Sequence, residues 1–338
     1  MAFLSDINDS VQQRIWLSNL ENDMGKILPY IDDPKVTDIA IGNGGELIIE
    51  GIGMDKNYTG IIFNEATTTS IIRAAASVMG INIDEKNPIV EGSIKLSKHK
   101  IRFEGILPPR SATTPMIFIR RPSSEIYSLE DYLKEKRISR QQYDLLIKHI
   151  RNRSNIVLSG ATGSGKTTML NAILWKMVEF TPDDRFYVVE DAGEIQCKAR
   201  DIVPIWAEGE DTVKAVRIAL RCHVNRIIFG ELRYGSTTNE LLKAWNTGHK
   251  GGITTIHSDS AILAIEKIRT YLREVIVGEL PDVAQSVQLV IHMIPTKNGP
   301  IVNEIYETHQ TTQLFQSSYE GGQATSNFIQ ELELNKLI

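Results

Sequence analysis

The first third of the chain carries two kinds of hydrophobic pattern, one helical and one extended. Apolar residues recur at the spacing of an amphipathic, core-facing helix over 10–28, which Pro29 is expected to end, and over 66–79. Short alternating or apolar runs predict β-strands at 36–41, 46–50, 100–107 and 116–119. The first two runs flank a glycine-rich turn and predict a hairpin. These elements predict a smaller α+β domain over residues 1–121.

The rest of the chain changes to a regular alternation of strand and helix. Residues 122–135 are expected to form a linker, within which Ser128 is placed to cap a helix. Apolar runs typical of buried strands then stand at 155–159, 186–190, 227–230 and 253–256. Helical spacing appears between them, at 168–180, 212–220 and 237–245. This alternation predicts an α/β domain with a mostly parallel sheet over residues 136–310, whose ligands bind at the carboxyl ends of the strands.

Residues 311–338 differ from both predicted domains. The part from 311 to 326 is rich in Gln, Ser, Thr and Gly and carries no recognisable motif. We expect a polar, mobile C-terminal tail, with a short helix over 328–338.

Composition narrows the class of protein. The 338 residues are 42% hydrophobic, which is enough for two packed cores. A net charge of −5 argues against bulk DNA as the main partner, so no stable direct nucleic-acid binding is expected. Cys197 and Cys222 form no CxxC pair and indicate neither a local zinc site nor a dithiol. No apolar run reaches the roughly 20 residues of a membrane helix, so we expect a cytoplasmic protein with only peripheral membrane contact.

The strongest chemical signal lies between the strand at 155–159 and the helix at 168–180. Gly160 is followed, after four residues, by Gly165, Lys166 and Thr167, the spacing of a phosphate-binding P-loop. Such a loop turns backbone N–H groups and the positive end of a helix toward a polyphosphate. Lys166 is expected to reach the β- and γ-phosphates of ATP, and Thr167 to bind Mg²⁺. The predicted nucleotide-binding residues are Gly160, Ala161, Thr162, Gly163, Ser164, Gly165, Lys166, Thr167 and Thr168.

Polar residues also follow the other predicted strands. Glu231 is expected to orient and polarise the attacking water, because we expect its strand to lie next to the P-loop strand. His257 is expected to donate a hydrogen bond to the γ-phosphate. The carboxylates after the strand at 186–190 are predicted to hold hydrated Mg²⁺, with Glu190 also catalytic: Glu190, Asp191 and Glu194. A zinc site at His249 and His257 is a weaker alternative, because only one acidic partner lies nearby.

Four arginines lie in or beside the predicted strands of the first domain: Arg102, Arg110, Arg120 and Arg121. Taken alone, their positions fit solvated surface residues. They also fit arginines that neutralise charge building on the γ-phosphate of a bound nucleotide. The residues by themselves leave both interpretations open.

At these segments the chain resembles the secretion ATPases of the VirB11 type. Four stretches match the family's motifs in order: 160–167 (Walker A), 188–194 (Asp box), 226–233, RIIFGELR (Walker B), and 247–257, TGHKGGITTIH (His box). In the N-terminal half, 102–109 resembles the family's R…LPP segment and 117–122 its FxIRRP strand. Residues 127–132 resemble the conjugative, TrbB-like branch more than the pilus retraction branch. Residues 220–227 depart from the pattern, lacking an Arg and a Pro.

The resemblance implies a RecA-like P-loop NTPase domain preceded by the smaller α+β domain. It implies that Arg102 and Arg120 or Arg121 face the phosphates, and that ATP lies between the P-loop domain and an N-terminal domain of a homo-hexamer. The implied activity is Mg²⁺-dependent ATP hydrolysis that powers type IV secretion or conjugative DNA transfer. Inner-membrane secretion components would be its partners, at the inner face of the cytoplasmic membrane.

Three other functions remain open from the sequence. The chain fits a type IV pilus extension or retraction ATPase, which belongs to the same motor class. It also fits a RecA-like nucleic-acid translocase, although the acidic net charge disfavours this. A non-enzymatic alternative is an ATP-gated assembly platform that exchanges partners and turns over slowly.

Overall fold

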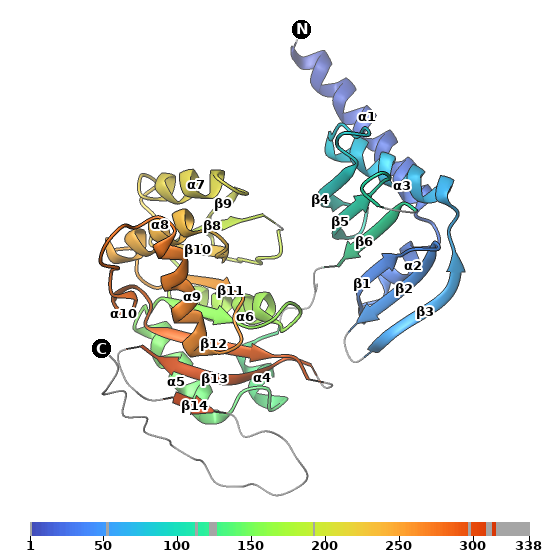
Figure 1. The fold of residues 1–338 in the computed structure, drawn as a ribbon. Helices are drawn as coiled ribbons and strands as arrows, with labels where there is room; N and C mark the ends of the chain where they lie inside the picture. Colours follow the sequence, from blue (N-terminus) through green and yellow to red (C-terminus); the bar gives the residue numbers. More distant parts are fainter. Residues whose placement is uncertain are drawn as a thin grey trace, which may run out of the picture. The chain divides into compact units, whose positions relative to one another are not determined.

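The computed structural model describes residues 2–51, 54–111, 114–121, 127–191, 193–296, 299–308 and 313–315. The chain divides into two compact units, Met1–Ser124 and Glu125–Ile338 (Figure 1). This division falls inside the segment predicted as a linker. None of the helices in the described part of the chain combines the length and apolar character needed to cross a membrane.

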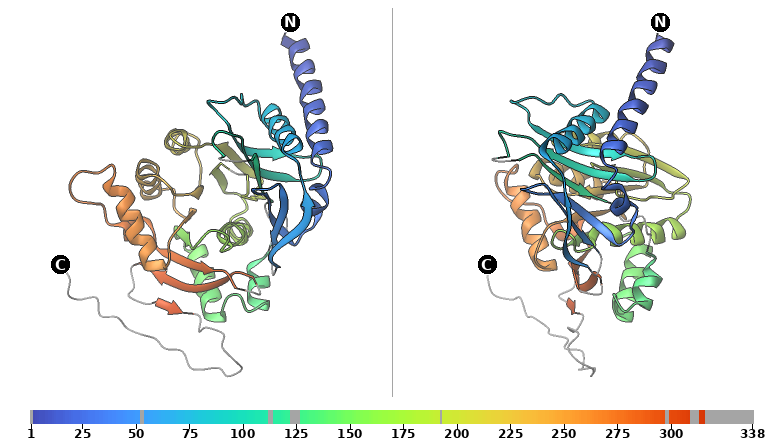
Figure 2. Two further views of the ribbon diagram at one scale, coloured as in Figure 1. Left: turned by 45° about the vertical axis from the view of Figure 1, so that its right-hand side comes forward. Right: turned by 90° about the vertical axis from the view of Figure 1, so that its right-hand side faces the viewer.

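The first unit is built on an antiparallel sheet with the order β3-β2-β1-β6-β5-β4. Helices α1 (Ala2–Asp23) and α3 (Glu65–Met79) pack together, and α3 contacts β4, β5 and β6 (Figure 2). The short helix α2 (Leu28–Asp32) precedes the sheet. The strands are β1 (Val36–Ile41), β2 (Glu46–Gly51), β3 (Met54–Ile62), β4 (Ile89–Lys95), β5 (Lys100–Ile106) and β6 (Met116–Arg120). The predicted hairpin is confirmed by the antiparallel pairing of β1 with β2.

The helix expected over 10–28 differs from the structure in three ways, the first being that the observed helix begins at Ala2. It ends at Asp23, and Pro29 lies in the first turn of α2 instead of ending a helix, because proline's missing N–H is harmless there. Its predicted core-facing side is also only partly buried. Leu20 and Met24 lie in the core, whereas Ile15 is 54% exposed.

The second unit contains a largely parallel sheet with the order β14-β13-β12-β7-β11-β10-β8-β9. Pairs from β12 to β9 are parallel, while β12–β13 and β13–β14 are antiparallel. The strands are β7 (Ile156–Ser159), β8 (Arg185–Glu190), β9 (Asp201–Trp206), β10 (Arg226–Glu231), β11 (Ile253–Ile256), β12 (Leu289–Ile294), β13 (Ile301–Glu307) and β14 (Gln313–Phe315). The predicted mostly parallel α/β sheet is therefore confirmed.

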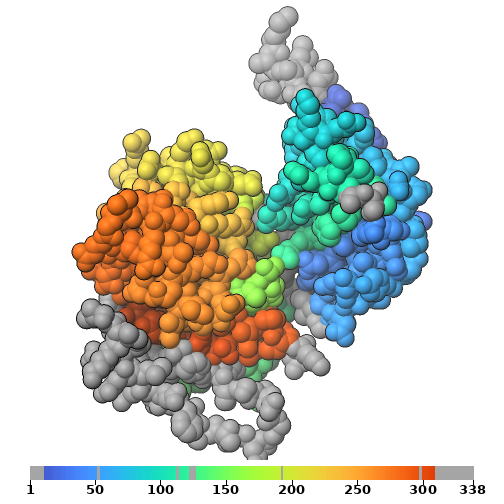
Figure 3. All heavy atoms as spheres, viewed as in Figure 1, coloured from blue at the N-terminus to red at the C-terminus, as the bar shows by residue number. Residues whose placement is uncertain are grey.

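Helices cover both faces of this sheet because its strands bury alternate side chains on opposite sides. Ile156 and Leu158 pack with α4 (Leu129–Lys134), α5 (Arg140–Arg151) and α6 (Lys166–Phe180). Val157 packs on the other side with the later helices. These are α7 (Asp211–Ala219), α8 (Gly235–Asn246), α9 (Ala261–Arg273) and α10 (Val283–Ser286). Figure 3 shows α9 and the residues that follow it, in orange, at the surface of this unit.

The sequence patterns missed several strands of the two sheets. The edge strand β9 alternates weakly and remains partly exposed, and the mainly polar strand β3 is exposed over much of its length. Within the tail predicted to be mobile, Gln313–Phe315 forms β14 beside β13, which corrects that expectation for these residues. The helix expected over 328–338 lies outside the described residues.

Candidate active site

The loop between β7 and α6 has the backbone geometry that its glycines permit. A side chain at Gly160 would come within 2.4 Å of the carbonyl oxygen of Met293 and the hydroxyl of Ser164, so only glycine fits. Gly165 has φ 80° and is the N-cap of α6. The N–H groups in the first turn of α6 have no partner within the helix and lie at the loop, where they can bind an anion.

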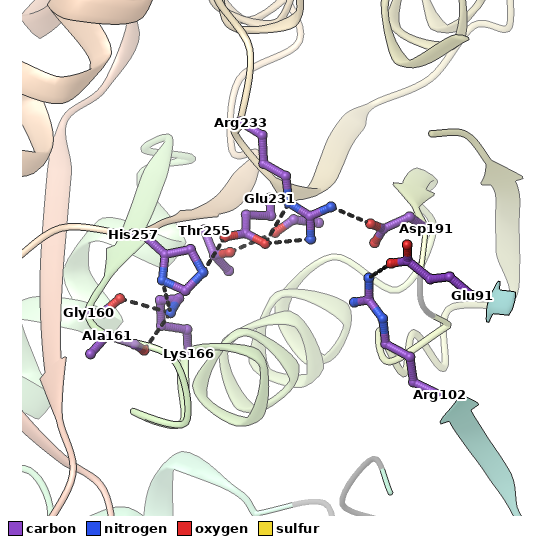
Figure 4. A network of polar contacts seen from close by, with 11 residues as sticks. Glu91, Arg102, Gly160, Ala161, Lys166, Asp191, Glu231, Arg233, Thr255 and His257 are labelled. Carbon is purple, nitrogen blue, oxygen red and sulfur yellow. Dashed lines mark hydrogen bonds and ion pairs between the residues drawn. The ribbon is translucent and has the colours of Figure 1, made fainter. Parts of the chain in front are cut away.

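Lys166 is buried and folded back onto its own loop (Figure 4). Its Nζ donates hydrogen bonds to the carbonyl oxygens of Gly160, at 2.9 Å, and Ala161, at 2.8 Å. The hydroxyl of Ser164 is fully buried and has no hydrogen-bond partner among the described residues. A cationic side chain, an unpartnered hydroxyl and a helix N-terminus at one loop fit a phosphate group. Thr167, in the first turn of α6, is half-buried beside them.

His257 follows β11, the strand that pairs directly with β7. Its Nδ1 lies 3.3 Å from Nζ of Lys166. Because an ammonium group can only donate, Nδ1 acts as the acceptor. Burial lowers the pKa of His257; the charge of Glu231 opposes this shift and that of Lys166 adds to it. The imidazole is therefore neutral at neutral pH, with its proton on Nε2.

Glu231 is held between His257 and Arg233 (Figure 4). Nε2 of His257 lies 2.6 Å from Oε1 of Glu231. This is a close contact rather than an aligned hydrogen bond, since the buried Oε1 receives none from the described residues. On the other side, Arg233 donates to Oε2 from Nε at 3.0 Å and from Nη2 at 2.7 Å.

Arg233 also joins Glu231 to the loop after β8. Its Nη1 donates to Oδ2 of Asp191 at 2.7 Å. Burial alone lowers the pKa of Arg233, but the hydrogen bonds and charges of Glu231 and Asp191 raise it well above its usual value. A cavity of about 20 Å³, room for one water, lies beside these residues and is also lined by Glu190. The predicted site residues did not include Arg233, although it follows Glu231 by two positions and ends the stretch 226–233 that resembles the family's Walker B motif.

The strand order corrects one step of the sequence reasoning. The strand that carries Glu231, β10, does not lie next to the P-loop strand, because β11 stands between them. The strand that carries Glu190, β8, lies one position further out. The direct neighbours of β7 are β11 and β12, so His257 rather than Glu231 is the polar residue that reaches Lys166.

Two of the three carboxylates predicted to hold Mg²⁺, Glu190 and Asp191, are engaged with protein groups. Oε2 of Glu190 accepts hydrogen bonds from the backbone N–H of Glu194, at 2.7 Å, and Ile195, at 3.0 Å, so Glu190 shapes its own loop. Within the described ranges, no cluster of three His, Cys, Asp or Glu side chains is arranged as a metal site. Because Mg²⁺ keeps most of its waters, Thr167 and one carboxylate would be enough.

The candidate arginines of the first unit separate into two groups. Arg102 and Arg120 are cross-strand partners on β5 and β6, so their side chains share one sheet face. Arg120 pairs with Asp38 at 2.9 Å, and Arg102 with Glu91 at 3.3 Å. Arg121 is only 7% exposed and donates to the carbonyl oxygen of Asp33 at 3.2 Å. Of the predicted arginines, Arg102 and Arg120 therefore lie side by side on one face of the first unit's sheet.

Comparison with known proteins places the chain in a family and agrees with its fold. Residues 52–329 match the family described as "Type II/IV secretion system protein". The chain is 34% identical over 313 residues to the conjugal transfer protein TrbB of Rhizobium radiobacter, covering 89% of this chain and 95% of that one. It is 33% identical over 282 residues to a probable TrbB of Sinorhizobium fredii, covering 83% and 85%.

A solved structure shows a similar fold. The Legionella pneumophila ATPase DotB superposes with a TM-score of 0.62 at 19% identity, over 84% of this chain and 80% of that one. These comparisons show the fold of the chain, which is a RecA-like domain preceded by a smaller N-terminal domain.

Proposed function

Because the chain belongs to the family of type II/IV secretion system proteins, we propose that it is an ATPase that hydrolyses ATP to ADP and phosphate with Mg²⁺ as cofactor. The observation that carries this proposal is the continuous line of contacts from Lys166 through His257 to Glu231. It joins a phosphate-binding loop to a carboxylate suited to act on water. A loop that only binds nucleotide would not need the contact between His257 and Glu231.

Lys166 and the loop bind the substrate. In the structure Lys166 donates to two carbonyl oxygens of its own loop. The β- and γ-phosphate oxygens of ATP are stronger acceptors for this ammonium group than carbonyl oxygens are, because they carry negative charge and form an ion pair with it. Lys166 would exchange its carbonyl partners for phosphate oxygens, and the hydroxyl of Ser164 would gain the acceptor that it lacks among the described residues.

Glu231 acts on the attacking water. The water oxygen forms a bond to the γ-phosphorus, the bond from that phosphorus to the bridging oxygen breaks, and ADP leaves. A proton of the water passes to Oε1 of Glu231, which receives no aligned hydrogen bond from the described residues. Neutral His257, between Glu231 and Lys166, would donate from Nε2 to the γ-phosphate once nucleotide is present.

Mg²⁺, when bound, would neutralise charge on the β- and γ-phosphates, held by Thr167 and a carboxylate of the Asp191 loop. Arg102 and Arg120 of the first unit would supply further positive charge at the γ-phosphate. The larger role that we propose is a homo-hexameric motor for conjugative DNA transfer or type IV secretion, since the TrbB relatives are conjugal transfer proteins. Its place would be the cytoplasm, in contact with inner-membrane secretion components.

Phosphate release by the purified protein with ATP and Mg²⁺ tests this function. Lys166→Ala should abolish turnover and weaken nucleotide binding. Glu231→Gln should bind ATP with nearly unchanged affinity while hydrolysis falls by roughly 10²-fold or more, the usual contribution of a general base. The exposed pair of Lys214 with Asp211 offers a control, so Lys214→Ala should behave as wild type. Wild-type turnover in the Glu231→Gln protein would exclude that residue as the base, and absence of turnover in the wild type would reject the ATPase.

A further inference from the structure

A row of buried polar side chains crosses the sheet at the last residue before the nucleotide-binding loop. Ser159 on β7 is in register with His292 on β12, and His292 with Glu304 on β13. Their exposed fractions are 0%, 4% and 3%, respectively. Directly paired residues of neighbouring strands point to the same face, so the row lies on one side of the sheet. None of the three takes part in the chemistry described above.

The row is tied to the start of α9, the helix that follows His257. Oγ of Ser159 lies 2.9 Å from Nδ1 of His292 and donates to the carbonyl oxygen of Ser260 at 3.4 Å. Ser260 is the N-cap of α9. At the other end of the row, Oε1 of Glu304 accepts a hydrogen bond from the backbone N–H of Ala261 at 2.6 Å. Ser159 on β7 and Glu304 on β13 therefore both hydrogen-bond to the backbone at the start of α9.

One assignment of protons satisfies both contacts of Ser159. A hydroxyl has a single proton, so if it donates to Ser260 it must accept from Nδ1 of His292. Burial lowers the pKa of His292, against the opposing charges of Glu304 and Asp259, so the ring is neutral at neutral pH. Neutral His292 with its proton on Nδ1 then serves as the donor. The carboxylate of Glu304 lies at the positive end of α9, which favours its buried charge.

Such a row is costly inside a sheet. The strand that carries His292 is otherwise apolar, and burying polar groups costs free energy that only complete hydrogen bonding offsets. An apolar residue would pack there without that cost. The row joins the start of the nucleotide loop to the start of α9. The same two segments are also in contact through His257, just before α9, which lies 3.3 Å from Lys166 of the nucleotide loop.

We propose that His292 and Glu304 are positioning residues that hold the start of the nucleotide loop and the start of α9 as one unit, so that His257 stays in place against Lys166. This inference rests on the proposed nucleotide site. It assigns a role in nucleotide binding to residues that do not touch the nucleotide themselves.

The full-length protein tests this proposal through the KM for ATP and the affinity for a non-hydrolysable ATP analogue. His292→Leu and Ser159→Ala should each raise the KM about five- to tenfold, the effect of losing one buried hydrogen bond. The double variant should be no worse than the worse single variant, because both changes break the same contact. His292→Asn should retain most of the affinity, because its amide nitrogen lies close to the position of Nδ1. Glu304→Gln, which removes the negative charge at the N-terminus of α9, should also raise the KM.

The chain offers a matched control elsewhere in the same unit. His149 is also buried between a serine and a glutamate, with Nδ1 2.8 Å from Ser154 and Nε2 2.8 Å from Glu307. His149→Leu should lower the melting temperature as His292→Leu does but leave the KM unchanged. If both variants raise the KM equally, or neither does, the positioning role is wrong. Should His292→Leu fail to fold, Ser159→Ala decides the question alone. Absence of ATP binding by the wild type would instead reject the nucleotide site itself.

Discussion

Arg233 holds Glu231 by two hydrogen bonds to the same carboxylate oxygen, from Nε at 3.0 Å and from Nη2 at 2.7 Å. This leaves Oε1, the other oxygen, on the side of His257. Two donations from one rigid guanidinium group hold Oε2 in place more firmly than a single hydrogen bond from an ammonium group would. The orientation of the proposed base thus depends on a residue outside the predicted site.

Replacing Arg233 should lower turnover more than nucleotide binding. In Arg233→Ala, Glu231 can rotate and Asp191 loses its partner, so we expect kcat to fall roughly 10- to 100-fold with little change in the affinity for an ATP analogue. Arg233→Lys should recover only part of the loss. Arg217, whose exposed side chain pairs with Glu240 at 3.0 Å, provides the control, and Arg217→Ala should keep the wild-type kcat. Equal kcat values for the two alanine variants would contradict the positioning of Glu231 by Arg233.

The paired arginines of the first unit should act on the reaction rather than on binding. Arg102→Ala and Arg120→Ala are each expected to lower kcat at least about tenfold while nucleotide affinity changes little, because charge on the γ-phosphate grows in the transition state. Single-turnover hydrolysis and analogue binding separate the two effects. Lys56, paired with Glu50 at 3.9 Å on the same sheet, serves as a control of similar exposure. A kcat as high in Arg102→Ala as in Lys56→Ala would make Arg102 an ordinary surface residue.

The ion pair of Asp184 should make stability depend on pH. Asp184 contacts Arg226, which is 0% exposed, at 2.8 Å and Arg153 at 2.6 Å. Burial by itself raises the pKa of Asp184, but hydrogen bonds from Arg153, Thr181 and Arg226 and the charge of Arg226 lower it below its usual value. The ionised carboxylate is therefore favoured in the folded state. Its contribution to stability is complete above the unfolded pKa of about 3.9 and is lost as pH falls through the lower folded value.

We accordingly expect Asp184→Asn to lower the free energy of unfolding by roughly 3 kcal/mol at pH 7, since it leaves Arg226 buried without its counter-charge. The difference from wild type should shrink as pH falls below about 4. Urea unfolding between pH 7 and pH 3 measures both. The exposed pair of Asp144 with Arg140 is the control, because a solvent-screened surface ion pair contributes little to stability. A difference that stays constant across this pH range would disprove the linkage.

Much of the candidate site follows from the sequence because its determinants are local. The turn between β7 and α6 depends on glycines at fixed spacing. A side chain at Gly160 would clash with its neighbours, and Gly165 has a positive φ that other residues rarely adopt. Apolar periodicity likewise predicts α3 and α6, since each buries a face set by residues three and four positions apart. Asn64 caps α3 through a hydrogen bond to the backbone N–H of Thr67, a contact within one turn.

Only the tertiary structure decided which of these strands, helices and loops lie next to one another. Nothing local to β10 states that β11 separates it from β7, because in a parallel sheet each strand reaches its place through a long crossover that leaves its neighbours open. For the same reason the sequence predicted Glu231 as a site residue but not the hydrogen bonds by which Arg233 joins it to Asp191. His292 likewise stood in the sequence only as one polar residue within an apolar strand. Hydrophobic spacing predicts most of the buried faces, although not that of the first helix, where Ile15 is exposed. Only the strand order determines which buried polar groups find partners.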